Sequence, residues 1–219
     1  GMEQEEALFK VLKETIIASR NIRFEGDGYS EEWKEEALKR GLTNINHVPE
    51  AILRFGDEQS KNVLIGENIF NENELNCRVE VELEKYTKKI QIESRILGDL
   101  AINHIVPTAV IYQNRLLENL RGLRETFSPE EYELLGSDRR ELVKEIQLHI
   151  IDIKRLVREM TEARRIANHK TSQVEKAYSY QESVCPYMEM IREHIDHLEL
   201  EIDDEIWPLP KYRELLFAK

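Results

Sequence analysis

The sequence predicts an all-α protein: long antiparallel helices in a three- or four-helix bundle, with a smaller helical N-terminal segment. Its 219 residues include only 9 Gly and 6 Pro, and no Gly follows Gly136. Apolar residues recur at steps of three and four over long stretches, which is the helical period. One such stretch, residues 71–127, is too long to be stable by propensity alone and therefore needs other long helices beside it.

The N-terminal segment, residues 1–70, is expected to hold short helices. Residues 3–20 carry one apolar stripe at helical spacing, formed by Leu8, Val11, Leu12, Thr15 and Ile16. Gly1 and Met2 indicate an expression remnant, and a helix that follows so directly suggests a piece excised from a larger protein.

A turn is expected after this first helix, at residues 23–29, where two glycines interrupt the pattern. Ser30 then has the side chain to cap a helix over residues 31–40. Gly41 stands where a helix end favours a left-handed backbone. A further short helix is expected at residues 49–55, followed by a connecting stretch, residues 56–70, with one helical turn.

The domain at residues 71–219 is expected to begin with the longest helix. Asn71 and Glu74 have the spacing of a capping box, which predicts the start of that helix. Pro107 removes a backbone donor and crowds the preceding turn, so a kink is expected near Asn103. Gly98 offers a second interpretation, a close helix crossing. The segment around Pro107, residues 100–112, is apolar on every side.

Two more helices complete the predicted bundle. Ser128 and Pro129 mark a helix start, and Gly136 is predicted to end that short helix, so that Ser137 caps the next one. The next helix runs to His169. The last helix has the cleanest apolar seam, formed by Val184, Met188, Ile191, Ile195, Leu198 and Ile202.

The C-terminal end is the candidate interaction surface. Pro208 and Pro210 end the last helix, and an apolar tail follows. A short apolar tail is useful only if it docks on this chain or on a partner. The candidate interface residues are therefore Trp207, Tyr212, Leu215, Leu216 and Phe217.

Residues for catalysis or metal binding are not evident in the sequence. The net charge of −12 argues against nucleic-acid partners, and no apolar run is long enough to cross a membrane. Cys77 and Cys185 stand apart, which favours a reducing cytoplasm over a disulfide framework. No catalytic, cofactor-binding or metal-ligating residue is assigned, because no nucleophile turn, Gly-rich phosphate loop or Glu-x-x-His pair is found.

Several polar residues have both a structural and a functional interpretation. His194 and His197 share a helix face, which is more often surface than metal ligand. His104 is interpreted as a core histidine, hydrogen-bonded across the bundle, in preference to an acid–base group. A set of ion pairs is expected along one helix, formed by Glu93, Arg95 and Asp99.

Three segments closely resemble the C-terminal region of type III glutamine synthetase, the large-subunit bacterial form of that enzyme. They are YTKKIQIESRILGDLAINHIVPTAVIYQNRLLENLRGL, ARRIAN and HIDHLELEIDDEIWPLPKYRELLF. Upstream, RFEGDGYSEEWKEEALKRGL is similar to the same family, so the resemblance covers nearly the whole chain. The ending Trp207–Phe217 is its most specific part.

The resemblance implies an ATP-dependent ligase that joins ammonia to glutamate through a γ-glutamyl phosphate. Such enzymes use ATP and Mg²⁺ held by carboxylates, and they assemble as two stacked hexameric rings. Their catalytic motifs lie on sheet-containing domains that no part of this sequence matches. In that frame residues 1–70 would end the catalytic region and residues 71–219 would form the C-terminal domain.

The resemblance thus implies a structural role for this chain within a cytoplasmic homo-oligomer. Its partners would be the catalytic region of the same subunit and neighbouring subunits, with no nucleic acid or membrane partner, and alone it would be inactive. The alternative is a stand-alone helical adaptor or regulatory module that binds a partner helix or a small ligand in its bundle, as the clean seam of the last helix would allow.

Overall fold

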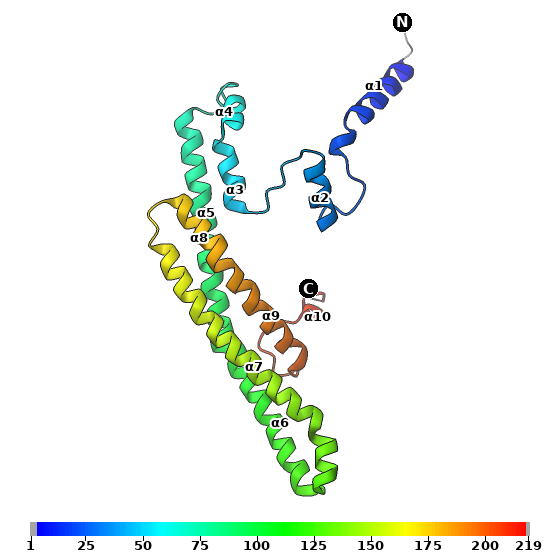
Figure 1. Ribbon diagram of the computed structural model, residues 1–219, viewed down its shortest axis with the longest axis vertical. Coiled ribbons are helices and arrows are strands. Elements are labelled where there is room, and N and C mark those ends of the chain that lie inside the picture. Colours follow the sequence, from blue (N-terminus) through cyan, green and yellow to red (C-terminus); the bar gives the residue numbers. More distant parts are fainter. Residues whose placement is uncertain (1–3, 218–219) are drawn as a thin grey trace. The chain divides into compact units, whose positions relative to one another are not determined.

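The computed structural model describes residues 4–217, with the backbone alone at Tyr212 and Arg213, so the interpretation of Gly1 and Met2 lies outside the described residues. Within that range every regular element is a helix and no strand is present, which confirms the all-α class. Contacts divide the chain into two compact units, residues 1–51 and 52–219. The second unit holds helices α5 to α9 (Figure 1). The expected domain boundary at residue 70 stays a prediction.

The first unit contains helices α1 (Gln4–Ala18) and α2 (Glu31–Lys39). The predicted cap is confirmed, because the Ser30 side chain accepts a hydrogen bond from the Trp33 N–H at 3.2 Å. Gly41 has a φ of 74°, the left-handed conformation that glycine adopts without steric cost. No residue of α1 is buried, so its apolar stripe is not covered by the unit to which it belongs.

Two short helices precede the long ones: α3 (Val48–Leu53), which continues into a 3₁₀ turn (Arg54–Gly56), and α4 (Glu58–Leu64). The expectation of a single helical turn in residues 56–70 was too low, since α4 has 7 residues. The signal that sequence reasoning missed is Asp57, whose side chain accepts from the Ser60 N–H at 2.8 Å and caps α4.

The longest helical segment consists of α5 (Glu72–Leu100), a π-helical turn (Ala101–Ile105) and α6 (Val106–Thr126). The capping box is confirmed, because Asn71 and Glu74 each accept a hydrogen bond from the other's backbone N–H at 2.9 Å. The irregularity expected near Asn103 is the π-helical turn. Pro107 lies two residues after this turn, and the wider turn accommodates the missing donor and the bulky ring.

Helix α7 (Pro129–Asn168) is one unbroken helix of 40 residues. Its capping box at Ser128 is confirmed, but the prediction that Gly136 ends a short helix is wrong. Gly136 is buried, and a Cβ atom there would lie 3.2 Å from Leu120 Cδ2 on α6. The glycine therefore serves a close helix crossing, and the helix continues through it because its backbone stays right-handed.

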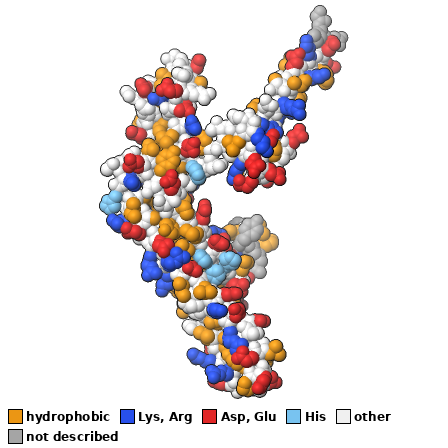
Figure 2. Space-filling view, viewed as in Figure 1, with side chains coloured by type: hydrophobic (Ala, Val, Ile, Leu, Met, Phe, Trp, Pro, Cys, Tyr) orange, Lys and Arg blue, Asp and Glu red, His pale blue; other side chains and the backbone are white. Residues whose placement is uncertain are grey.

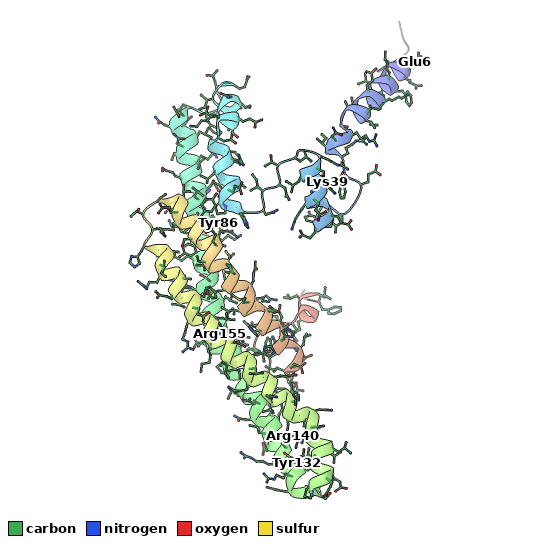
Figure 3. All side chains as sticks on the ribbon, in the orientation of Figure 1. Glu6, Lys39, Tyr86, Tyr132, Arg140 and Arg155 are labelled. Carbon is green, nitrogen blue, oxygen red and sulfur yellow. The ribbon has the colours of Figure 1, made fainter. Side chains whose placement is uncertain are left out.

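A small polar cluster lies on α7 near the start of that helix. The Arg140 guanidinium pairs with the Glu133 carboxylate at 2.6 Å and lies 5.1 Å from the centroid of the Tyr132 ring (Figure 3). Such exposed pairs contribute little free energy individually. They restrict the orientation of side chains around the glycine crossing.

The last helical segment has the same order of elements as the α5–α6 segment: a helix, a π-helical turn and a second helix. Helix α8 (Gln173–Ser179), a π-helical turn (Tyr180–Val184) and α9 (Cys185–Glu201) follow without a break, and Pro186 lies two residues after the turn, as Pro107 does. All members of the predicted seam except Met188 are buried: Val184, Ile191, Ile195, Leu198 and Ile202. The prediction that Pro208 and Pro210 end this helix is wrong, because α9 ends at Glu201 and Ile202 is an extended cap residue. The sequence did not predict that this helix begins near Gln173.

The core lies where α7 packs against α6 and α9, and each of these two helices runs antiparallel to α7 in Figure 1. Gly98 is buried on α5, and a Cβ atom there would lie 3.4 Å from Met160 and from Val157 on α7. The predicted close crossing at Gly98 is therefore present. The fully buried side chains of this core include Ala101, Ile105, Ile153, Met160, Tyr180 and Leu198.

Candidate functional site

The predicted interface residues at the C-terminal end fall into two groups. Trp207 is only 8% exposed and belongs to the core of the second unit. Leu215, Leu216 and Phe217 are 60–78% exposed, and the side chain of Tyr212 lies outside the described residues. Trp207 thus anchors the tail to its own unit, whereas the three exposed residues are free to contact another surface. Their role at an interface stays a prediction.

Lys211 fixes the base of the tail, and sequence reasoning missed it. Its ammonium group donates to the backbone oxygens of Glu199 at 2.6 Å and Ile202 at 3.3 Å, and it pairs with Asp204 at 2.6 Å. A cation at the end of α9 satisfies carbonyl groups that have no partner within the helix. The side chain of Lys211 is 17% exposed, so the segment after α9 is held close to the helix end.

Three histidines come together between α7 and α9. The sequence placed His194 and His197 on one face, and the structure adds His149 from α7. The Nδ1 atoms of His149 and His194 lie 2.9 Å apart, and the rings of His149 and His197 stack with centroids 5.2 Å apart. Figure 2 shows histidine side chains gathered over α9.

A hydrogen bond between two imidazole nitrogens needs one donor and one acceptor. The bond between His149 and His194 is therefore lost if both rings are fully protonated. Among the residues that the structure describes, no group of three or more His, Cys, Asp or Glu side chains is arranged to hold a metal ion. The cluster is thus a proton-sensitive contact between two helices, and the Mg²⁺ implied by the resemblance has no candidate ligand set in the described range.

Burial lowers the pKa of His149 below its ordinary value of about 6.5, and the nearby His194 and His197 act in the same direction. Asp152 and Glu145 on α7 oppose this shift by a smaller amount. The folded state therefore holds its proton less tightly than the unfolded chain does. It follows that the stability from this site is complete above about pH 6.5 and is lost as the pH falls through the lowered pKa.

The His149→Gln variant is accordingly expected to have a melting temperature that falls less steeply between pH 7.5 and pH 5 than that of the unsubstituted chain (the parent chain). Glutamine keeps a hydrogen-bonding group but does not titrate, so only the proton-linked part of the stability is removed. Thermal unfolding followed by circular dichroism at constant ionic strength measures the two slopes. His104→Gln, at an exposed position, is the control and should keep the parent slope. Equal slopes for the parent and His149→Gln would show that the cluster is not a proton-linked contact.

Two structural interpretations of polar residues are wrong. His104 is exposed, not buried, because the buried positions of the π-helical turn are taken by Ala101 and Ile105. The predicted ion-pair set on α5 has other partners: Glu93 pairs with Lys89 at 4.0 Å, and Asp99 accepts from the Asn103 side chain at 2.6 Å.

Tyr86, labelled in Figure 3, links α5 to the last helical segment. Its hydroxyl donates to Gln181 Oε1 at 2.5 Å and lies 3.8 Å from Cys185 Sγ. Burial raises the pKa of both the Tyr86 hydroxyl and the Cys185 thiol. A partly buried thiol with a raised pKa is a poor nucleophile, which favours a structural contact. Cys77 is exposed.

These features define a helical packing domain: a buried core between long helices, with uncovered apolar side chains on α1 and the tail. The family described as the glutamine synthetase C-terminal domain matches residues 7–124, more than half of the chain, and the chain belongs to this family. No helix within residues 4–217 is both long and apolar enough to cross a membrane.

Three known proteins are similar over nearly the whole chain. The identity is 69% over all of this chain to a glutamine synthetase of Bacteroides fragilis, and 32% over 97% of it to a type-3 glutamine synthetase of Dictyostelium discoideum. A glutamine synthetase of Butyrivibrio fibrisolvens is 28% identical. The chain spans 29–31% of the length of these relatives. The resemblance to the C-terminal region of type III glutamine synthetase is thereby confirmed.

Proposed function

We propose that this chain is the C-terminal helical part of a type III glutamine synthetase, and that its own role is to brace the catalytic region and to contact neighbouring subunits of a homo-oligomer. The parent enzyme would join ammonia to glutamate in the cytoplasm with ATP and Mg²⁺. The residues for that reaction would lie in the part of the subunit that this chain does not span. The second unit would serve as a bundle of three long antiparallel segments, α5–α6, α7 and α8–α9.

The observation that carries the proposal is the uncovered stripe of α1. No residue of this 15-residue helix is buried, and its exposed apolar residues include Leu8, Phe9, Val11, Leu12, Ile16 and Ile17. An isolated helix of this length is only marginally stable in water. An apolar face of this kind therefore supports a partner surface, which the remaining two-thirds of the parent subunit would supply.

The stand-alone adaptor is the second candidate, and the open apolar groove between α5 and α9 favours it. The two candidates differ in what precedes the chain in its gene. An upstream open frame that encodes a catalytic region supports the first, and a start codon with a ribosome-binding site at Met2 supports the second.

The test uses the parent protein with two substitutions on the stripe, Leu12→Ser and Ile16→Ser. Burial of two such side chains contributes about 3 kcal/mol or more, so docking of α1 should weaken by about 100-fold. We expect the variant to lose glutamine formation and to change its assembled mass in analytical ultracentrifugation. The matched control is Lys10→Ser with Glu14→Ser, which introduces the same residue on the opposite face of α1 and leaves the net charge unchanged.

The isolated 219-residue chain should form no glutamine from glutamate, ammonia and ATP. Turnover by this chain at the level of the parent protein would contradict the proposed division of roles. So would a stripe variant that keeps full activity and assembled mass.

A further inference from the structure

An open groove of about 770 Å³ lies between α5 and α9 in the second unit. Its floor is apolar, with three side chains from α5 and two from α9: Ile96, Leu97, Leu100, Met188 and Leu200. Ile96 is 54% exposed and Leu200 is 83% exposed. Large apolar side chains that remain this exposed beside one another are a common mark of an interaction surface.

The rim of the groove is acidic. It carries four carboxylates, those of Glu93, Glu189, Glu193 and Asp196. Of the described residues that line the groove, Arg192 and His197 are the basic ones, and Arg192 is already bonded to Asp196 at 2.5 Å. Glu93 pairs loosely with Lys89 at 4.0 Å, and within residues 4–217 no ion pair is formed by Glu189 or Glu193.

The carboxylates of Glu93 on α5 and Glu189 on α9 both act on the same group. Each raises the pKa of the Cys185 thiol, although burial is the main cause of that shift. The two helices therefore direct negative charge toward one region. Glu189 and Glu193 form no ion pair within the described residues, and a cationic partner would relieve the repulsion between their carboxylates.

The shape of the groove fits a helix. The residues on α9 extend from Met188 to Leu200, a distance of roughly 18 Å at the helical rise, which is about three turns. Two neighbouring helices with apolar side chains between them form the usual docking surface for the apolar face of a third. A second copy of this chain is a poor occupant, because its net charge of −12 would add to the repulsion at the rim.

We propose that the groove between α5 and α9 binds an amphipathic helix whose apolar stripe is flanked by lysine or arginine. The inference deepens the proposed bracing role and rests on it, since the polypeptide that this chain braces would supply the helix. The apolar floor supplies affinity, and Glu189 and Glu193 select the basic flanks.

The test measures fluorescence anisotropy of two labelled synthetic helices with the complete 219-residue chain. Both peptides are about 14 residues long and carry the same stripe of leucines on one helix face. The positions beside this stripe are lysine in one peptide and glutamate in the other. We expect the lysine peptide to bind at least about tenfold more tightly. The advantage should shrink between 50 mM and 500 mM salt, because salt screens exposed charges.

Variants of the chain locate the binding site. Ile96→Ser with Leu200→Ser should weaken binding of the lysine peptide by about tenfold or more. Leu148→Ser with Ile151→Ser, at apolar positions on α7 that are 53% and 52% exposed, should leave it unchanged. All four positions are exposed, so circular dichroism should confirm an intact fold.

Variants that remove charge from the rim are paired with a control in the same way. Glu189→Gln with Glu193→Gln should reduce both the affinity and its salt dependence, whereas Glu118→Gln with Glu125→Gln on α6 should change neither. The groove proposal is overturned if the peptides bind equally, if neither binds, or if the two charge variants behave alike. It is also overturned if sedimentation shows a dimer of this chain that Leu200→Ser dissociates. None of these results affects the α1 test of the parent enzyme.

Discussion

Replacing Tyr180 with alanine is expected to lower the free energy of unfolding by about 3–5 kcal/mol, the largest loss that we expect from a single side chain in this protein. Tyr180 is fully buried and begins the π-helical turn between α8 and α9. Its hydroxyl donates to Asn168 Oδ1 at 2.9 Å, at the end of α7. Truncation would thus leave a large cavity where two helices meet. The surrounding side chains could fill this cavity only in part.

Urea unfolding followed by circular dichroism measures this loss, and Tyr180→Phe separates the ring from the hydroxyl. Phenylalanine keeps the packing and removes one hydrogen bond, a loss of about 0.5–1.5 kcal/mol. Asn168 Oδ1 is not left without a donor, because Gln91 Nε2 also reaches it at 3.3 Å. If the alanine and phenylalanine variants were equally stable, the hydroxyl and not the ring would be the main contribution.

Features set by neighbouring residues could be predicted from the sequence. The capping boxes at Asn71 and Ser128 need only residues three apart, and both are present. Gly41 follows the same rule, because a left-handed residue at a helix end depends on local geometry. Pro107 likewise perturbs the turn directly before it.

Features set by distant residues could not. Gly41 ends a helix and Gly136 does not, although both follow a plausible helix. Gly136 instead gives room to the side chain of Leu120 on α6. The sequence gives no sign of which glycine faces a neighbour. Pro186 was overlooked for a similar reason: the residues before it pack against α7, and this keeps the helix continuous through a π-helical turn.

The candidate sites divide in the same way. The spacing of His194 and His197 predicts a shared face, but His149 is 45 residues away from His194 in the chain and joins them only through packing. The apolar tail was recognised from its composition. Composition does not show which apolar side chains the chain covers itself, and here it covers Trp207 but not Phe217.

The second large loss is expected for Met160→Ala, about 2–5 kcal/mol, because Met160 is fully buried opposite Gly98. Gly98→Leu should also destabilise, since its added carbons need the space of Met160 and Val157. Such overpacking costs about 1–3 kcal/mol, which exceeds the gain of about 1 kcal/mol from replacing a helical glycine. In the Met160→Ala background the same change should stabilise, because the leucine side chain then fills the cavity.

A double-mutant cycle measures this reversal in the effect of Gly98→Leu on the free energy of unfolding. It compares chemical unfolding of the unsubstituted chain, both single variants and the double variant. Gly122→Leu is the matched control on the same helical segment, because a Cβ atom at Gly122 meets nothing within 4 Å. It should have the same small stabilising effect in both backgrounds, by helix propensity alone. Additive effects of Gly98→Leu and Met160→Ala would show that α5 and α7 do not need a glycine at their crossing, and that Gly98 is tolerated there without being required.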